Sequence, residues 1–436
     1  MVPLNFLEQR FFSLCFGCVF LSIAEPAMSL PSSPEVVSGS AQMHRKSENL
    51  LEIKVQDRSI LEYRDFQIGQ EQTLRFVQDS KGSSVLNRVK GPHPAEIFGR
   101  LESNGRVFLV SPEGIYFGPK SQVHVGSLIA STLDLTNENF LLENYAFSLE
   151  NKASQIIHQG SMESIEGSIA LLAPTIDNAG SITAEAGSVH LLSAEHVTLD
   201  FTGDGLMRFA LEGALKESFL SQSGQVVAGQ VEMRIPAARR ALVDVVNLSG
   251  AECGEVFIEE NGMIKLVSYS SLKAEEVSLE ASQLYIQGTV EAQKVSGEGG
   301  SIHLLGRDIY LEGASLDVSA PKGSGEVLIG GGYQGGGDLP WSRSVMMDRE
   351  TKILASALEK GDGGLVVLWS NEYTEFKGQI VSQGGSQSGN GGLVETSGKL
   401  GLRVTGSKVD TGALAGAKGQ WLLDPNEVII KLSADD

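Results

Sequence analysis

The segment "GSIALLA" at residues 167–173 returns as "GSVHLLS" at 187–193 and as "GSIHLLG" at 300–306. Looser copies follow as "GEVLIGG" from residue 325, "GGLVVLW" from 363 and "GGLVETS" from 391. Each copy begins with a glycine, which suits a tight turn, and continues as a short run in which apolar residues alternate. The repeated unit is therefore a glycine corner followed by a short strand.

A unit of this kind cannot fold alone, because its apolar face needs a neighbour. Stacked units would pair in parallel with the strands above and below, and like residues would then line up inside. A coil of about twenty residues per turn predicts an all-β protein built as a parallel β-helix. A β-sandwich and a propeller are the alternatives. The propeller is disfavoured, because it needs a period of about 40–50 residues with blade motifs, and the sequence shows none.

The composition agrees with many short strands joined by turns. The chain has 51 glycines among its 436 residues, and only 6% of its residues are aromatic. Its net charge of -20 argues against nucleic acid as a partner, because phosphates require a basic surface. The best candidates for helices are two short segments, 209–219 and 343–358.

The first 29 residues differ from the rest of the chain. Arg10 precedes the largely apolar run "FFSLCFGCVFLSIA", and a small-residue segment then ends at Ser29. This pattern predicts a signal peptide over residues 1–29, with a lipoprotein anchored through Cys18 as the alternative. Its removal would leave Cys253 without a disulfide partner. Residues 30–52 would then form a polar lead segment.

The first rung of a β-helix exposes unpaired backbone and an apolar interior unless another segment covers it. Residues 53 to about 130 contain more aromatic and charged side chains than the repeats do. We therefore expect an N-terminal β cap in this region.

The segment "VLNRVKGPHPAEIFGRLESNGRVFLVSPEGIYFGPKSQVHVGSLIASTLDL", residues 85–135, resembles the N-terminal secretion domain of filamentous haemagglutinin-type exoproteins of two-partner secretion systems. Residues 167–206 continue the resemblance, and "WLLDP" at 421–425 is similar to a segment of larger family members. The resemblance implies a right-handed parallel β-helix with an N-terminal β cap. It also implies a two-partner secretion domain over residues 53–215 and a β-helical extension over 216–436.

The resemblance implies export across both membranes of a Gram-negative-type envelope. The partner would be an outer-membrane transporter with periplasmic recognition modules, and no cofactor is expected. Family members are adhesins, cytolysins or contact-dependent inhibition proteins. We therefore expect a secreted or surface-exposed adhesin, with a receptor or glycan on a host or neighbouring cell as a further partner. A carrier of a cytolysin or contact-dependent toxin is a weaker alternative, because no distinct effector domain lies between "WLLDP" and Asp436, and such a carrier would be truncated.

A four-residue turn is the first candidate for recognition by the transporter. The family typically has Asn-Pro-Asn-Gly at this turn, whereas this chain has Ser111, Pro112, Glu113 and Gly114. Ser111 is expected to accept a hydrogen bond from a nearby backbone N–H, proline fixes φ, and glycine suits the last position. Any contact that the family's asparagine amides make with a transporter must differ here.

Asn87 and Arg88 are the second candidate for recognition. In one interpretation Asn87 caps a turn and Arg88 pairs with a carboxylate. In the other, this part of the cap presents an edge or a charge that the transporter reads, by strand addition.

A β-helix enzyme acting on extracellular polysaccharide is the main alternative function, because such enzymes need clustered carboxylates. Most of the candidate aspartates lie beside turn residues, where solvated corners are the simpler interpretation. They are Asp134, Asp177, Asp200, Asp204, Asp308 and Asp317. No nucleophile-elbow, zinc-protease or P-loop motif is present in the sequence, so we expect no enzyme activity.

No metal site is expected from the histidines or the glycine-rich segments. His190 and His303 occupy equivalent places in two repeats, and alternation puts them on the opposite face from the inward-pointing Val189 and Leu191. We therefore expect both histidines on the surface. Segments 330–338 and 360–364 resemble calcium-binding repeats, but they lack the nonapeptide period and are expected to be flexible loops.

Overall fold

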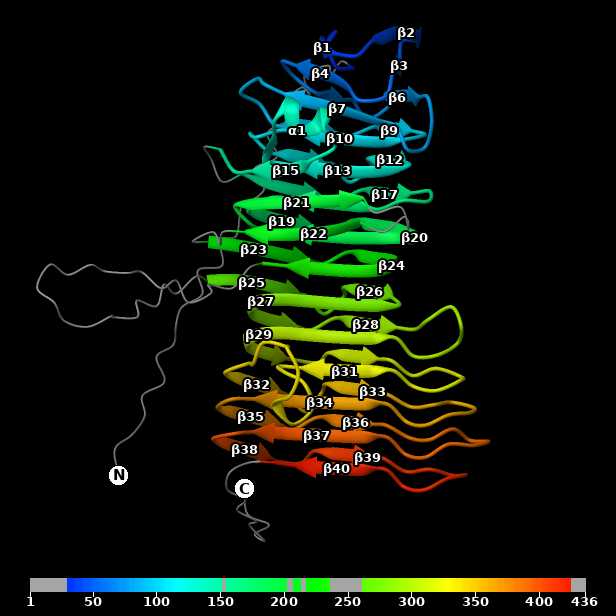
Figure 1. Ribbon diagram of the computed structural model, residues 1–436, viewed down its shortest axis with the longest axis vertical. Helices are drawn as coiled ribbons and strands as arrows, with labels where there is room; N and C mark the ends of the chain where they lie inside the picture. Colours follow the sequence, from blue (N-terminus) through cyan, green and yellow to red (C-terminus); the bar gives the residue numbers. More distant parts are fainter. Residues whose placement is uncertain (1–29, 151–153, 202–206, 213–216, 236–260, 425–436) are drawn as a thin grey trace, which may run out of the picture.

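The repeated segments stack on one another as parallel strands of a β-helix (Figure 1). The computed structural model describes residues 30–150, 154–201, 207–212, 217–235 and 261–424. Ile169 of the first repeat pairs in register with Val189 of the second, and Ile302 of the third pairs with Val327 of the fourth. The internal repeat thus marks successive coils, which confirms the predicted fold class. The predicted signal peptide, Cys253 and Asp204 lie outside the described residues.

Each coil contributes one strand to each of three faces, which we call faces A, B and C. Face A consists of β4 (Ser59–Tyr63), β7 (Ser84–Val89), β10 (Arg106–Val110), β13 (Ser127–Ser131), β18 (Ile169–Leu172), parts of β20 (Ser181–Leu192), β24 (Gln225–Arg234), β27 (Glu276–Ile286) and β29 (Ser301–Leu311), then β31 (Glu326–Ile329), β34 (Leu365–Ser370), β37 (Leu393–Gly398) and β40 (Gln420–Leu423). The repeats of the sequence all lie on this face.

Faces B and C complete each coil. Face B consists of β5 (Gln67–Ile68), β8 (Ala95–Ile97), β11 (Ile115–Phe117), β16 (Gln155–His158), β19 (Thr175–Asn178), β23 (Glu217–Gln222), β25 (Asn261–Leu266), the ends of β27 and β29, β32 (Ser344–Met347), β35 (Tyr373–Phe376) and β38 (Gly401–Val404). Face C consists of β3 (Leu50–Val55), β6 (Thr73–Gln78), β9 (Arg100–Ser103), β12 (Gln122–Val125), β17 (Ser161–Ser164), the starts of β20 and β24, β26 (Ser271–Ala274), β28 (Thr289–Ala292), β30 (Ser315–Asp317), β33 (Lys352–Leu354), β36 (Gln379–Val381) and β39 (Lys408–Asp410).

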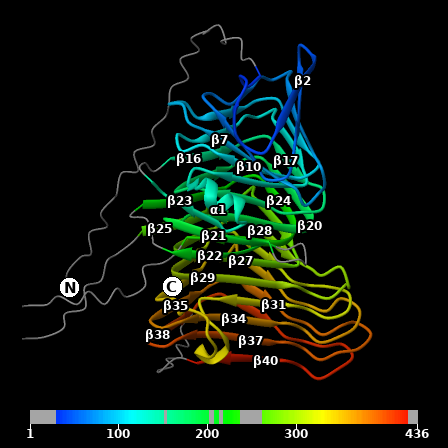
Figure 2. The ribbon, with the colours of Figure 1, turned by 45° about the horizontal axis from the view of Figure 1, so that its top comes forward.

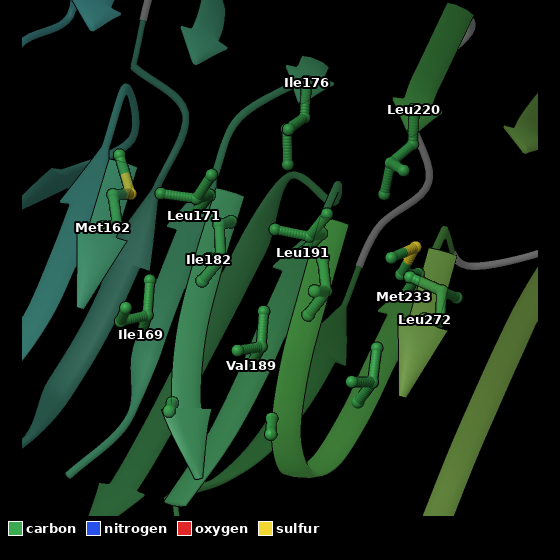
Figure 3. Close-up of a cluster of buried hydrophobic side chains, with 14 of the residues drawn as sticks. Met162, Ile169, Leu171, Ile176, Ile182, Val189, Leu191, Leu220, Met233 and Leu272 are labelled. Atoms are coloured by element: carbon green, nitrogen blue, oxygen red, sulfur yellow. The ribbon is translucent and has the colours of Figure 1, made fainter. Parts of the chain in front are cut away.

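The core runs along the axis of the rod, because alternate residues of every strand point inward. Ile169 and Leu171 lie directly beside Val189 and Leu191 of the next coil (Figure 3). All four side chains are fully buried in one continuous apolar cluster. Aliphatic stacking of this kind explains how a chain poor in aromatic residues fills its interior.

Glycine recurs in the repeats because coils approach each other closely at the corners. A Cβ on Gly187 would overlap the carbonyl oxygen of Gly167 in the coil before it. The same overlap relates Gly392 to Gly364. The glycine of each repeat is therefore a steric requirement of stacking.

Replacing Gly187 by alanine is expected to lower the free energy of unfolding by about 1–3 kcal/mol, because the added methyl forces adjacent backbones apart. Gly82→Ala is the matched control, since the nearest atom to its new Cβ is Ser80 Oγ at 3.8 Å. Urea denaturation of the two variants measures the difference. Equal midpoints would refute the steric explanation.

The N-terminal cap is antiparallel and starts earlier than the sequence suggested. Strand β1 (Glu35–Ser38) pairs antiparallel with β4, and β2 (Ala41–Ser47) pairs antiparallel with β3. Parallel pairing begins with β3 against β6. The expectation of a separate polar lead over 30–52 and of a cap over 53 to about 130 was therefore wrong. The polar residues of β2 made this segment look unlike a strand, although the strand is ordered at the top of the rod (Figure 1).

A small antiparallel sheet covers the outside of face A over the first coils. It consists of β14 (Asp134–Leu135), β15 (Tyr145–Ser148), β21 (His196–Phe201) and β22 (Met207–Glu212), and we call it the covering sheet. Helix α1 (Asn137–Leu141) connects β14 to β15 and lies outside the coil in the rotated view (Figure 2). Thr136 caps this helix by accepting a hydrogen bond from Asn139 N at 3.2 Å.

Both predictions of a helix were wrong. Residues 209–219 include the end of β22 and the start of β23, and residues 343–358 contain β32 and β33. Their apolar spacing serves strand pairing rather than a helical face. Besides α1, the described residues contain one short 3-10 helix, η1 (Tyr333–Gly335). Among them no helix has the length and apolar character needed to cross a membrane.

Candidate functional site

Arg88 joins the capped end of the rod to the covering sheet. Its Nε lies 3.0 Å from Asp134 Oδ1 of β14, and its Nη1 lies 3.2 Å from Glu62 Oε1 of β4. The guanidinium also donates to the Asn137 side chain and to the Leu135 carbonyl oxygen. Because Arg88 is only 6% exposed, this network is a structural junction, and the prediction that Arg88 pairs with a carboxylate is confirmed.

Asn87 is buried in the middle of β7 and does not cap a turn. Its Nδ2 donates to the Phe108 carbonyl oxygen of the next coil at 3.3 Å. The expectation of a turn cap was wrong, because Asn87 lies inside β7, where it pairs with Leu109 of β10, and not at the turn that follows Val89. Neither Asn87 nor Arg88 offers a side chain to a partner in the folded rod.

The covering sheet is held by an aromatic cluster on the outside of face A. Phe108 of β10 points outward and is fully buried. Its ring centroid lies 4.9 Å from that of Tyr145 and 5.3 Å from that of Phe140. Phe147 and Phe201 complete the cluster at 6.5 and 6.3 Å from Phe108. The outer side of these coils is therefore a second core.

The turn at residues 111–114 follows β10 and lies beside the preceding coil. Gly114 N donates to the Ser111 carbonyl oxygen at 3.0 Å, and Ala95 N donates to the Gly114 carbonyl oxygen at 3.0 Å. Ser111 Oγ accepts from Ala95 N at 3.3 Å, which confirms the expected serine contact. Gly114 has φ of +120°, so the glycine is required there.

The structure brings the two predicted motifs onto neighbouring strands. Arg88 of β7 pairs with Val110 of β10, the residue that immediately precedes the turn. Ser111 and Gly114 are buried, whereas Pro112 and Glu113 are exposed. The outward part of the site is therefore the tip of the turn. The role of these six residues in transporter recognition stays a prediction.

Sequence reasoning missed a buried polar ladder on face B. His158 Nδ1 lies 2.7 Å from Asn178 Oδ1, and Asn178 Nδ2 donates to Gln222 Oε1 at 2.8 Å. The three residues pair on consecutive coils and are fully buried. Burial lowers the pKa of His158 to about 4, although its contact with Asn178 opposes the shift. No repeat in the sequence marks these positions, because three different residue types occupy them.

The ladder predicts a pH dependence of stability. Between pH 6.5 and about 4, the unfolded chain binds a proton on His158 that the folded chain does not. Stability should therefore fall with falling pH across this window, by up to about 3 kcal/mol in total from this residue. His158→Gln should remove that contribution, as measured by urea denaturation at pH 7 and pH 4.5. An unchanged difference between the two pH values would contradict the assignment.

The prediction that His190 lies on the surface was wrong. Its ring is fully buried, and its centroid lies 5.2 Å from that of Phe209 of the covering sheet. His190 Nε2 lies 2.7 Å from Ser188 Oγ, and Nδ1 lies 3.1 Å from Glu232 Oε2. This order of groups is that of a nucleophile, base and carboxylate, but both Ser188 and His190 are closed to solvent. The arrangement therefore serves packing beneath the covering sheet.

His303 follows the expectation more closely, since the described strands of the covering sheet do not reach its coil. Its side chain is 27% exposed, and its Nε2 lies 2.8 Å from Glu326 Oε1. That contact with His303 is the largest influence on Glu326 and lowers the pKa of the carboxyl group. The two equivalent histidines of the repeats thus have different environments: the covering sheet buries His190, whereas His303 stays partly exposed.

The described candidate aspartates do not converge. Asp134 binds Arg88, Asp200 lies in the covering sheet, and Asp317 lies on face C. Asp177 and Asp308 share face B, but β23, β25 and β27 separate their strands.

Asp308 is fully engaged by its neighbours. Its carboxylate accepts hydrogen bonds from Arg343 Nε at 2.9 Å, Arg343 Nη2 at 2.8 Å and Ser344 Oγ at 2.8 Å, and from Arg307 Nε at 3.1 Å. Burial alone would raise the pKa of Asp308, but these hydrogen bonds lower it overall. The carboxylate is therefore an ionised anchor for two arginines.

The glycine-rich segment 330–338 packs against face A instead of forming a free loop. The Trp341 and Trp369 ring centroids lie 5.3 Å apart, and Gln334 N donates to Glu395 Oε2 at 2.7 Å. Burial raises the pKa of Glu395. The contact between Gln334 of the segment and the Glu395 carboxylate contradicts the expectation of a flexible loop. Within the described ranges, no three histidine, cysteine, aspartate or glutamate side chains are grouped to hold a metal.

A capped parallel β-helix is the architecture expected for the secretion domain of a two-partner secretion exoprotein. The model of the TPS secretion domain matches residues 27–309. The chain belongs to this family, the secretion domains of two-partner secretion exoproteins. The structure is similar to the crystal structure of the HMW1 secretion domain from Haemophilus influenzae, with a TM-score of 0.75 and 26% identity over 91% of this chain and 100% of that chain.

Two curated relatives from Haemophilus influenzae are each named heme/hemopexin-binding protein. One is 25% identical over 250 residues, which are 56% of this chain and 27% of the relative. The other is 23% identical over 351 residues, which are 72% of this chain and 37% of the relative. The chain thus spans about a third of the length of the curated relatives it matches. Membership of the family implies recognition by an outer-membrane transporter and export to the cell surface or the extracellular space. The predicted domain boundary at residue 215 stays a prediction.

Proposed function

We propose that this chain is an exported, non-enzymatic adhesin that attaches to a receptor or glycan on a host or neighbouring cell. The observation that carries the proposal is the architecture, in which strands stack without interruption from the cap to β40 (Figure 1). A rod of this kind separates the end that a transporter meets from the surface that contacts another cell. The engaged or dispersed state of the described aspartates supports the non-enzymatic part of the proposal.

An attachment assay tests this function. Cells that export the chain and cells that lack it are compared for adherence to epithelial and bacterial cells, and the purified chain is applied to a glycan array. We expect several-fold more adherence with the chain and saturable binding of the purified protein. Binding to haem or hemopexin without any cell attachment would contradict the adhesin proposal and favour the binding function for which the two relatives are named.

The tip of the turn is proposed as the part of this site that touches the transporter. Pro112 and Glu113 are its exposed residues, and Ser154 Oγ donates to the Pro112 carbonyl oxygen at 2.5 Å. That bond fixes the backbone of the tip while the Pro112 ring stays exposed. The tip therefore offers a defined shape in place of the amides found in the family's turn.

Combined replacement of Pro112 by alanine and Glu113 by glutamine is expected to reduce export several-fold. Stability should change by no more than about 1 kcal/mol, because both side chains lie at the surface. Gly114→Val serves as the contrast, since its positive φ predicts loss of both export and stability. Secretion yield and urea midpoints measure the two effects. Normal export of the Pro112 and Glu113 variant would show that these two side chains are not read.

A further inference from the structure

The strand β2 leaves one edge of the cap unpaired. Within the described part of the chain, its only hydrogen-bonded neighbour is β3, with which it pairs antiparallel from Ala41 to Ser47. Six of its seven residues are exposed. Figure 1 places β2 at the top of the rod, beyond the first parallel coil. A free strand edge offers backbone donors and acceptors to another strand.

Basic and acidic residue types alternate along the outside of face C, starting at β2. Opposed residues on six consecutive strands are basic and acidic in turn: His44, Glu52, Arg75, Glu102, His124 and Glu163. Arg75 Nε lies 2.8 Å from Glu102 Oε2, and His124 Nδ1 lies 3.2 Å from Glu163 Oε2. Opposite charges on facing strands stabilise one register over its neighbours. We call this row of six residues the charge ladder. Each basic position of the ladder favours an acidic residue on the neighbouring strand.

The charge ladder ends on a basic strand. His44, Arg45 and Lys46 occupy consecutive positions of β2, although the whole chain has a net charge of -20. Lys46 Nζ lies 3.3 Å from Glu52 Oε1, and Glu48 in the following turn is the nearest acidic residue along the chain. A strand that continues the alternation beyond β2 would place an acidic residue beside His44, and Arg45, on the other side of β2, favours a second acidic neighbour.

We propose that the free edge of β2 receives an acidic, extended strand from a periplasmic module of the transporter. The proposal rests on the family's export route and on the recognition of the capped end. A second copy of this chain is a poorer occupant. Antiparallel pairing of two β2 edges centred on Arg45 would place Arg45 beside Arg45 and His44 beside Lys46 of the second copy, and facing like charges destabilise a strand pair.

Binding of the purified mature chain to the purified periplasmic fragment of its transporter tests the proposal. Arg45→Glu combined with Lys46→Glu is expected to weaken the complex at least about tenfold. Lys399→Glu combined with Lys418→Glu is the matched control, since both lysines are exposed on the last coils and the charge change is the same. The control should bind like the wild type. Equal affinity of both double variants would overturn the proposal.

Hydrogen exchange of the wild-type complex gives a second measurement that does not depend on a variant. Amides of residues 41–47 should exchange more slowly when the fragment is bound, because strand addition uses the N–H groups of the free edge. Unchanged exchange of β2 in a formed complex would also overturn the proposal, as would self-association of the chain through β2. Either result would leave the family's export route intact. Absence of any complex, together with release that does not depend on the transporter, would instead refute recognition of the capped end.

Discussion

Replacement of Arg88 by methionine is expected to lower the free energy of unfolding by about 3–5 kcal/mol. The substitution keeps an apolar side chain of similar length but leaves Glu62 and Asp134 without the buried cation between them. Lys90 Nζ, at 2.8 Å from Glu62 Oε2, still neutralises one of the two carboxylates. Asp134 then has no equivalent replacement in the network, so the β14 end of the covering sheet should loosen first.

Arg75→Met is the matched control for this prediction. Arg75 also pairs with a carboxylate of a neighbouring coil, Glu102, but its side chain is 42% exposed. Solvent screens that pair, so we expect a loss of only about 0–1 kcal/mol. Urea denaturation of both variants measures the contrast. Similar losses in the two would mean that Arg88 is not the junction described here.

Replacement of Phe108 by alanine is the second large expected effect, with a loss of about 3–5 kcal/mol. Phe108 is fully buried between the coil and the covering sheet, and four aromatic rings surround it. The cavity would lie outside the coil, so the axial core formed by residues such as Ile169 would stay intact. The covering sheet should therefore lose protection from hydrogen exchange before the coils do.

Phe219→Ala provides the comparison, because Phe219 also points outward from a coil strand but is 38% exposed. We expect it to cost at most about 1 kcal/mol. Denaturant midpoints give the total losses, and exchange of residues 145–148 and 196–201 shows where the structure opens. Uniform loss of protection along the whole rod in Phe108→Ala would contradict a covering sheet that can open separately.

The coil could be predicted because its physical cause repeats along the chain. Parallel stacking places Val189 beside Ile169, and the corner at Gly187 excludes a side chain. Apolar residues and glycines therefore recur at equivalent positions of successive repeats. The predicted pairing of Arg88 with a carboxylate was also confirmed. A buried arginine needs an anion beside it, and an acidic chain offers many carboxylates. The identity of that anion depended on a contact between β7 and β14 that no local pattern encodes.

Two of the errors concern residues on the outside of the coil. Alternation correctly placed His190 on the outer side of face A, but it carries no information about the covering sheet that buries this residue. The antiparallel strand β2 was read as a polar lead because its residues face solvent and lack the repeat. The buried ladder at His158 was missed for a different reason. It occupies an inward position that holds polar residues, and their type changes from coil to coil.

Export with and without the transporter tests the central claim most directly. The full chain is expressed alone or together with the candidate outer-membrane transporter, and its amounts in the periplasm, at the cell surface and in the medium are measured. We predict that the chain reaches the surface or the medium only when the transporter is present, and that it stays in the periplasm otherwise. Equal release in both strains, or retention in the periplasm despite a functional transporter, would contradict the account.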